Sequence, residues 1–169
     1  MKLLIVEDHI AFLEGLVDFL ENKLGGDWSI SSASSGTAAL QIFNQKHSIN
    51  VLMTDLNLPG INGSKLIKEV KKRHPKMKVV VLTMYYSRAI VSRLKELEID
   101  AFLTKNITRE EILDALLNIN SNEVFITEEI KGLFKDYHME DAGLYQENVD
   151  VFIRVYSLSK REIEVMYLM

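Results

Sequence analysis

An aspartate follows directly after a short apolar run near the middle of the chain. Val51–Met53 and Thr54 precede Asp55, and a run of this length is sufficient for a buried strand. Pro59 and Gly60 interrupt any regular structure a few residues later. Asp55 is therefore predicted at the carboxyl end of a strand, the edge of a parallel sheet where ligands and chemistry are usually found. The simpler alternative is that Asp55 only caps the turn that follows it.

More polar side chains stand at the ends of other apolar runs. They are Glu7 and Asp8 after Leu3–Val6, Thr83 after Val79–Leu82, and Lys105 after Ala101–Thr104. If the strands that carry them lie side by side, these side chains share one cleft with Asp55. Three carboxylates so close repel one another by roughly 1 kcal/mol per pair in water and by several in a partly dry site, so the cluster requires a cation. Oxygen ligands favour Mg²⁺, and His9 is interpreted as a turn residue rather than a ligand.

Beside Mg²⁺, Asp55 becomes a candidate nucleophile toward phosphorus. A carboxylate can form an acyl phosphate, and the metal neutralises charge on the transferred group. Thr83 and Lys105 are then predicted to donate hydrogen bonds to the phosphoryl oxygens. Taken singly, each has a simpler interpretation, Thr83 as a strand-end residue and Lys105 as a solvated lysine. The combination indicates phosphoryl chemistry.

The chain alternates strand-like and helix-like segments five times. The expected strands are Lys2–Val6, Trp28–Ala33, Asn50–Asp55, Lys78–Thr83 and Ala101–Thr104, and the expected helices are Ile10–Leu24, 36–46, Gly63–Arg73, Ser87–Glu98 and Thr108–Asn118. Near-continuous apolar runs are typical of strands buried on both faces. Thr108, with Glu111 three residues later, predicts a capping box. These units predict an α/β protein in which a five-stranded parallel sheet carries helices on both faces.

Composition excludes several classes of function. Of the 169 residues, 47% are apolar, 26% are charged and none is cysteine, which excludes disulfides and thiolate chemistry. No apolar run is long enough for a signal peptide or a membrane span, so a cytoplasmic protein without a membrane partner is expected. Residues 121–169 carry 5 Lys/Arg against 10 Asp/Glu. Because a nucleic-acid-binding surface is usually basic, residues 121–169 are not expected to bind nucleic-acid phosphates themselves.

The motifs together resemble the receiver domain of two-component response regulators over residues 1–120. The resemblance rests on Glu7-Asp8, the motif Asp55–Gly63, and the segments Val81–Thr83 and Ala101–Lys105. It implies the flavodoxin-like receiver fold, with strand order 2-1-3-4-5. It also implies that Asp55 accepts a phosphoryl group from a histidine kinase and that Thr83 and Lys105 bind this group. The implied Mg²⁺ ligands are Glu7, Asp8, Asp55 and the backbone carbonyl of Asn57.

The same resemblance makes Phe102 the switch aromatic, which turns inward when Thr83 moves toward the phosphate. A phosphoryl group adds close to two negative charges, and only the state with Thr83 and Lys105 drawn in can satisfy them. Without the family pattern, Phe102 would be interpreted as a core residue of its strand. One departure is Asn106, at a position where many receivers have proline.

The part of the chain after residue 120 requires a separate interpretation. Residues 121–155 are expected to form a linker with some helix, from Glu128 to Tyr137. In residues 156–169, Ser159 is a predicted N-cap with Glu162 three residues on. This stretch is similar to the opening of the LuxR-type helix-turn-helix domain of the NarL/FixJ class. The chain is therefore expected to stop inside its output domain, and promoter DNA would be bound only by a complete domain.

Three functions fit these observations. The leading one is a phosphoprotein that regulates transcription, which is not an enzyme although it assists its own phosphorylation and dephosphorylation. The second is a receiver that acts through protein contacts alone, with formation of a homodimer left open. The third is a haloacid-dehalogenase-like phosphatase, but Asn57 stands where that class needs a second acid. A flavodoxin-like nucleotide binder is weaker still, because Glu7-Asp8 would repel a phosphate.

Overall fold

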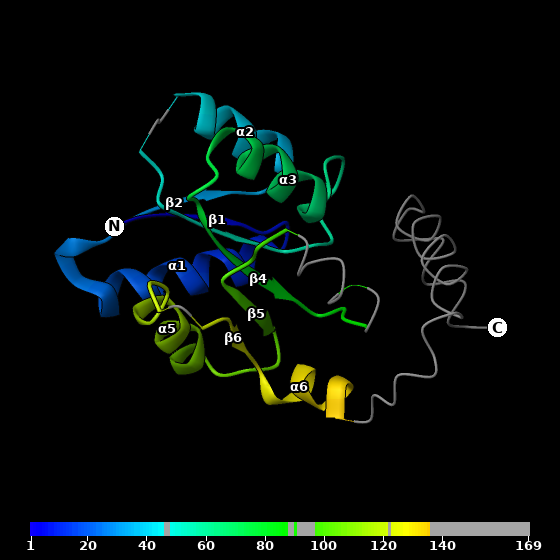
Figure 1. Ribbon diagram of the computed structural model, residues 1–169. Coiled ribbons are helices and arrows are strands. Elements are labelled where there is room, and N and C mark those ends of the chain that lie inside the picture. Colours follow the sequence, from blue (N-terminus) through cyan, green and yellow to red (C-terminus); the bar gives the residue numbers. More distant parts are fainter. Residues whose placement is uncertain (46–47, 88–89, 91–96, 122, 136–169) are drawn as a thin grey trace. The chain divides into compact units, whose positions relative to one another are not determined.

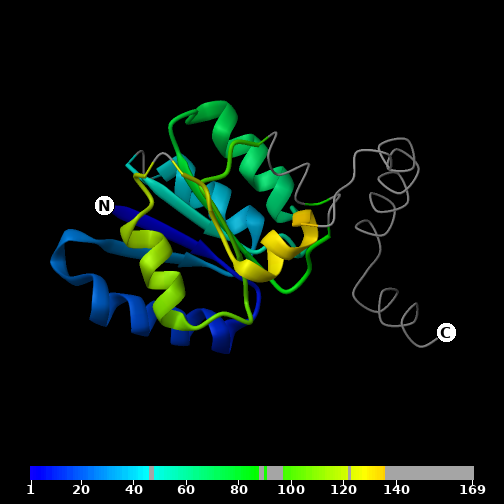
Figure 2. The same ribbon diagram turned by 60° about the horizontal axis from the view of Figure 1, so that its bottom comes forward.

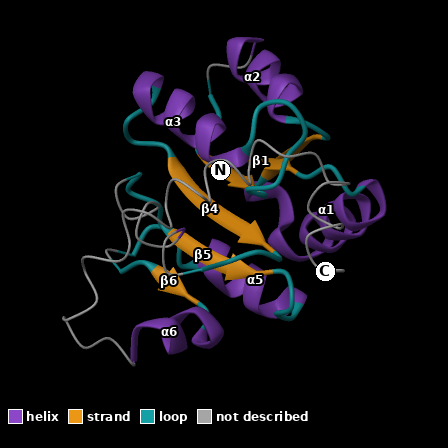
Figure 3. Cartoon of the chain, turned by 90° about the vertical axis from the view of Figure 1, so that its right-hand side faces the viewer, coloured by secondary structure: helices purple, strands orange, loops and turns teal. Residues whose placement is uncertain are grey.

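Parallel strands form a single sheet in the computed structural model, which describes residues 1–45, 48–87, 90, 97–121 and 123–135. Within these residues the strands are β1 (Lys2–Val6), β2 (Ser29–Ala33), β3 (Val51–Thr54), β4 (Lys78–Thr83), β5 (Ala101–Thr104) and β6 (Phe125–Ile126). Their order is β2-β1-β3-β4-β5-β6, and Figure 3 shows β4, β5 and β6 side by side. The predicted order 2-1-3-4-5 is confirmed. The predicted number of strands was wrong, because the two residues of β6 are too few to show a strand pattern.

Helices cover both faces of this sheet. On one face α1 (Ile10–Leu24) contacts α5 (Arg109–Leu117), and on the other α2 (Gly36–Gln45) contacts α3 (Gly63–Arg73), as Figures 1 and 2 show. The short 3-10 helix η1 (Gly25–Asp27) follows α1, and α6 (Glu128–Lys135) follows β6. The bounds of α1, α2, α3 and α5 agree with the prediction to within one residue. The predicted helix Ser87–Glu98 falls mostly outside the described residues.

Burial on both faces explains the continuous apolar runs of the strands. Every residue of β3 and β5 is buried, whereas the edge strand β2 is largely accessible. The core cluster against α1 and α5 draws on alternate strand residues and on one face of each helix, including Leu3, Ile5, Met53, Leu103, Leu16, Leu20, Ile112 and Leu116. Full burial of each such side chain contributes roughly 1.5–3 kcal/mol. This core fixes the strands whose ends carry the polar residues.

The register of the sheet brings those strand ends to one edge. Val6 of β1 is the partner of Thr54 of β3, and Thr83 of β4 is the partner of Thr104 of β5. Glu7, Asp55 and Lys105 each follow the strands so aligned. Since the strands are parallel, all of these residues emerge at the same, carboxyl edge.

A compact unit spans Met1–Phe134, so β6 and α6 are packed with the sheet although the sequence favours a linker there. The expected helical stretch from Glu128 is observed as α6. The remaining linker and the helix expected at 156–169 lie outside the described residues. Among the residues that are described, the helices are too short or too polar to cross a membrane.

The predicted capping box of α5 is present and supplies a first test of the fold. The Thr108 hydroxyl accepts a hydrogen bond from the Glu111 N–H, and the Glu111 carboxylate accepts one from the Thr108 N–H at 2.8 Å. Thr108→Ala is expected to lower the free energy of unfolding by about 1 kcal/mol in urea titration. Thr37→Ala, at an exposed position inside α2, is the matched control and is expected to change stability by less than about 0.5 kcal/mol. Equal effects of the two substitutions would contradict a capping role for Thr108.

Candidate functional site

A buried lysine lies between two buried carboxylates at the carboxyl edge of the sheet. The Lys105 Nζ is 2.5 Å from Glu7 Oε2 and 2.6 Å from Asp55 Oδ2. The three side chains are 9%, 3% and 7% exposed, in the order Lys105, Glu7, Asp55. The strand-end positions of these residues predict that they share one cleft, and the structure places them in direct contact.

The electrostatics of this cluster favour a charged lysine. Burial by itself lowers the pKa of Lys105, but hydrogen bonds and attraction from Asp55 and Glu7 outweigh burial, so the pKa lies above its ordinary value. The ammonium also lies 5.2 Å from the centre of the Phe12 ring of α1, close enough for a cation–π contact. Two carboxylates against one ammonium leave a formal charge of −1, so the cluster can accept further positive charge.

The loop after β3 holds the Asp55 carboxylate in a defined orientation. The Asn57 N–H donates to Asp55 Oδ1 at 3.1 Å, while Oδ2 faces Lys105. Behind the loop, a Cβ added to Gly63 would lie 2.0 Å from the Asp55 carbonyl oxygen. A Cβ added to Gly36 would lie 2.3 Å from the Ile61 carbonyl oxygen. Glycines at the starts of α2 and α3 therefore let both helices pack directly against the backbone of this loop.

Thr83 ends β4 and Phe102 lies in β5. The structure records no contact between either side chain and the cluster of Glu7, Asp55 and Lys105. Thr83 is fully buried; its Oγ1 accepts from the Tyr85 N–H at 3.2 Å, and its carbonyl accepts from the Lys105 N–H at 3.0 Å. Phe102 is 1% exposed. Phe102 lies within β5, whereas Lys105 is the first residue after this strand.

A group capable of holding a metal lies at the end of β1. Ligand atoms of Glu7, Asp8 and His9 all lie within 4.8 Å of one another. Asp8 is half-buried and His9 exposed, with His9 Nδ1 4.0 Å from Glu7 Oε1. Carboxylate oxygens suit a hard cation such as Mg²⁺, which keeps several water ligands. Glu7 is common to this group and to the Lys105 cluster, so an ion bound here and the Lys105 ammonium would both contact the Glu7 carboxylate.

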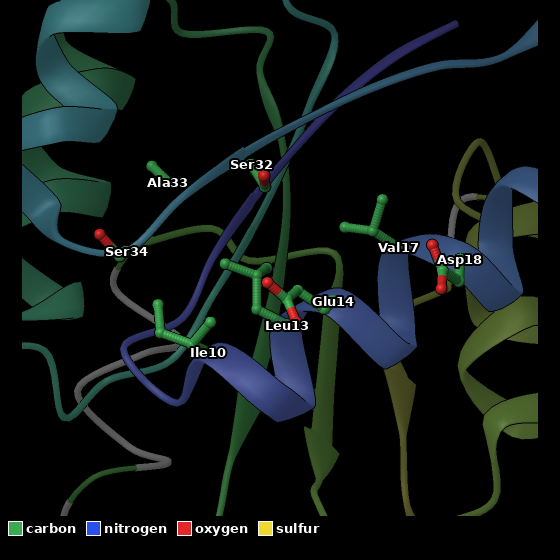
Figure 4. A pocket seen from close by; sticks show the side chains of 8 residues that line it. All are labelled: Ile10, Leu13, Glu14, Val17, Asp18, Ser32, Ala33 and Ser34. Carbon is green, nitrogen blue, oxygen red and sulfur yellow. The ribbon is translucent and has the colours of Figure 1, made fainter.

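A cavity of about 370 Å³ lies beside the site rather than at it. Apolar side chains, two serines and two carboxylates line it, from α1 and from the end of β2 and the residue after it: Ile10, Leu13, Glu14, Val17, Asp18, Ser32, Ala33 and Ser34. Figure 4 shows Leu13 and Ile10 on the helix facing Ala33 and Ser34 across this space. Glu7, Asp55 and Lys105 do not belong to its lining, so the candidate chemistry is separate from this cavity.

Some contributors to the site were not predicted from the sequence. Gly63 closes the motif that begins at Asp55, yet no pattern indicates that a helix packs against the Asp55 carbonyl. Phe12 is one of several apolar residues on α1, and only the fold places it beside Lys105. A glycine as the first residue of a helix, directly after the N-cap Asn62, is the signal that could have identified Gly63.

A parallel α/β sheet whose carboxyl edge carries an acidic cluster and a buried lysine defines a class of phosphoryl-receiving signalling domains. Residues 3–117 match the family described as the response regulator receiver domain, and the chain belongs to this family. The resemblance found in the sequence is thereby confirmed.

Known proteins similar to the chain extend the match beyond the receiver. The transcriptional regulatory protein RcsB of Salmonella typhi is 28% identical over 172 residues, which cover 99% of this chain and 73% of RcsB. A solved structure of RcsB from Salmonella enterica serovar Typhimurium, bound to promoter P1flhDC in the presence of the phosphomimetic BeF3−, has a TM-score of 0.71 at 27% identity and covers 80% of this chain and 66% of that one. A DNA-binding response regulator of the LuxR family from Staphylococcus aureus has a TM-score of 0.63 at 25% identity, covering 70% of this chain and 98% of that one. The relatives are transcriptional regulators rather than enzymes.

Proposed function

We propose that this chain is a phosphorylation-dependent regulator of transcription in which Asp55 accepts a phosphoryl group from a histidine kinase. The observation that carries the proposal is the Lys105 ammonium, buried between Asp55 and Glu7. A buried cation held by two carboxylates is poised to follow negative charge when one carboxylate becomes an acyl phosphate.

The transfer uses the orientation of the Asp55 side chain. One carboxylate oxygen attacks phosphorus while the bond from phosphorus to the imidazole nitrogen of the kinase breaks, and that nitrogen keeps the electron pair and takes up a proton. The Asn57 N–H and the Lys105 ammonium hold the two Asp55 oxygens before attack. Mg²⁺, held by Glu7, Asp8, Asp55 and the Asn57 carbonyl, would neutralise charge on the transferred group.

After transfer, the phosphoryl group carries about 1.5 to 2 negative charges next to Lys105, in place of the single charge of the Asp55 carboxylate. The Lys105 ammonium then transfers its hydrogen bond from the Asp55 carboxylate oxygen to the phosphoryl oxygens. Thr83, whose hydroxyl accepts from Tyr85 in the structure, donates to the same oxygens, and Phe102 follows the movement of Thr83. The state that satisfies the new charge gains population because only it offers these donors.

The output is proposed to lie after the receiver, which occupies residues 1–120. Residues 121–155 then act as a linker, and 156–169 correspond to the opening of a LuxR-type helix-turn-helix domain, the kind of domain that binds promoter DNA. The match to RcsB over 99% of the chain supports this division, because it continues past the receiver. The RcsB structure with promoter DNA and a phosphomimetic supports the link between phosphorylation and DNA. A homodimer is a natural partner arrangement for such an output, since two copies can bind two half-sites.

Intact-mass spectrometry tests the phosphoacceptor directly. Incubation with Mg²⁺ and acetyl phosphate is expected to add one phosphoryl group to the wild type, because Asp55 Oδ1 and Oδ2 are preoriented. Asp55→Asn should abolish the addition, since the amide is not a nucleophile. Asp27→Asn, which changes an exposed carboxylate in η1, should leave it intact. Addition to the Asp55→Asn variant, or no addition to the wild type, would refute the assignment.

A further inference from the structure

The short strand β6 and the helix α6 are attached to the strand that carries the site lysine. The Phe125 N–H donates to the Asp100 carbonyl at 3.0 Å, and the Thr127 N–H donates to the Phe102 carbonyl at 3.3 Å. Ile126 is the register partner of Phe102. A two-residue strand contributes little stability by itself, so additional contacts are needed to keep α6 in place.

One of these contacts reaches the end of β5, next to the site. The Thr104 hydroxyl donates to Glu129 Oε2 at 2.8 Å, a bond between residues 25 apart in the chain. Thr104 is fully buried, directly precedes Lys105 and is the register partner of Thr83. Glu129 is therefore linked, through one residue, to both proposed phosphoryl-binding residues.

The same contact lies on the face of the sheet that carries the switch aromatic. Side chains alternate along β5, so Thr104 shares a face with Phe102, whereas Leu103 points to the opposite face. Leu103 packs in the core cluster with α1, which agrees with this assignment. Movement of Phe102 or Thr83 would therefore alter the packing on the face of the sheet to which α6 is attached.

Attachment of α6 also has a cost in free energy, because it buries a polar group that has no hydrogen-bond partner in the part of the chain that the structure describes. Among the described residues, the Thr127 hydroxyl is a buried side-chain group without a hydrogen-bond partner, although Thr127 is only 6% exposed. The Thr127 carbonyl accepts from the N–H groups of Ile130 and Lys131, so the backbone at the start of α6 is satisfied and only the hydroxyl is not. A buried unpaired hydroxyl costs free energy and therefore opposes the docking of α6.

We propose that Glu129 is a positioning residue that couples α6 to the phosphorylation site through Thr104 and Lys105. The direction of this coupling follows from the charges involved. β3 and β5 are separated by β4, so Thr104, which donates to Glu129, lies roughly two strand spacings, about 10 Å, from the strand that precedes Asp55. Negative charge added at Asp55 disfavours the Glu129 carboxylate at Thr104. Phosphorylation therefore weakens the docking of α6, and by reciprocity docked α6 disfavours phosphorylation. This inference rests on the proposed function of Asp55.

The test combines hydrogen exchange of α6 with intact-mass measurement of phosphorylation, on the full chain. In the wild type, phosphorylation by acetyl phosphate and Mg²⁺ is expected to speed amide exchange in residues 128–135 at least 5-fold. Glu129→Ala should show the fast exchange before phosphorylation and a phosphorylation rate about 3-fold higher. Glu129→Gln keeps a hydrogen-bond acceptor without the charge, so it should retain slow exchange and lose most of the response to phosphorylation. Rescue of docking by Gln but not by Ala separates the hydrogen bond from the charge.

Two further variants make the outcome decisive. Thr127→Val removes the unpaired hydroxyl, so it should slow exchange of α6 and slow phosphorylation, opposite in sign to Glu129→Ala. Glu128→Gln, which changes the neighbouring carboxylate paired with the exposed Lys131, should alter neither. Full phosphorylation of the wild type without faster exchange of α6 would overturn the inference alone. Absence of any phosphoryl addition would instead overturn the proposed function and the coupling with it.

Discussion

Replacing Lys105 by methionine is expected to lower the free energy of unfolding by about 3–5 kcal/mol when no divalent cation is present. The substitution removes the ammonium that lies 2.5 Å from Glu7 and 2.6 Å from Asp55. Two carboxylates that are almost fully buried would then face each other without compensation. Because breaking one side of a buried ion pair leaves an unpaired charge, the loss is much larger than that of a surface pair.

Urea unfolding of the two proteins, with and without Mg²⁺, measures this effect. Mg²⁺ should recover part of the lost stability of Lys105→Met, because it supplies the missing positive charge. Lys131→Met is the matched control: its partner Glu128 is exposed, so the change should stay below about 1 kcal/mol. A Lys105→Met protein as stable as the control variant would show that the cluster does not depend on the lysine.

The pH dependence of stability has a defined sign at this site. Since the pKa of folded Lys105 is raised above 10.5, its ordinary value, the ion pairs stabilise the fold fully below that value. This contribution is lost as the pH rises through the folded pKa. Wild-type stability should therefore fall above about pH 10.5 more steeply than that of Lys105→Met, which has no such group to lose. Parallel curves for the two proteins in alkaline urea titrations would contradict the pKa direction.

Gly63→Ala is expected to disable the site through the backbone rather than through a functional side chain. The new Cβ would lie 2.0 Å from the Asp55 carbonyl oxygen and 2.7 Å from the Leu56 Cα, which are backbone atoms that cannot rotate away. Either the loop or α3 must move, at a cost of about 3 kcal/mol in stability. A displacement of Asp55 near 1 Å slows a positioned reaction by up to roughly 100-fold.

Two measurements separate the two effects of Gly63→Ala. Urea unfolding reports the loss of stability, and the rate of phosphoryl addition by intact mass, at a temperature where the variant is folded, reports the displacement of Asp55. Gly26→Ala is the matched control, because an added Cβ there meets no atom within 4 Å. Phosphorylation of folded Gly63→Ala at the wild-type rate would mean that the loop adjusts without moving the carboxylate.

Much of the architecture could be predicted from local sequence patterns. The bounds of α1, α3, β1, β4 and β5 agree with the prediction, because apolar periodicity, caps and turn residues act within a few positions of one another. The capping box of Thr108 and Glu111 is confirmed for the same reason. The candidate residues Glu7, Asp55 and Lys105 could be found because polar groups at the ends of apolar runs are conspicuous. The roles of all the site residues, Glu7, Asp8, Asp55, Asn57, Thr83, Phe102 and Lys105, remain predictions.

Other features depended on contacts between residues far apart in the chain. β6 is too short to form a pattern and becomes a strand only because β5 offers it an edge. The need for glycine at position 63 arises because α3 packs directly on the Asp55 backbone.

The sequence by itself determined which segments form strands and helices and which polar groups end the strands, since those properties depend on near neighbours. The tertiary structure decided that Lys105 lies between Glu7 and Asp55 and that Glu129 reaches Thr104. Such pairings depend on strand register and on how the helices pack, and these are settled only when the whole core assembles.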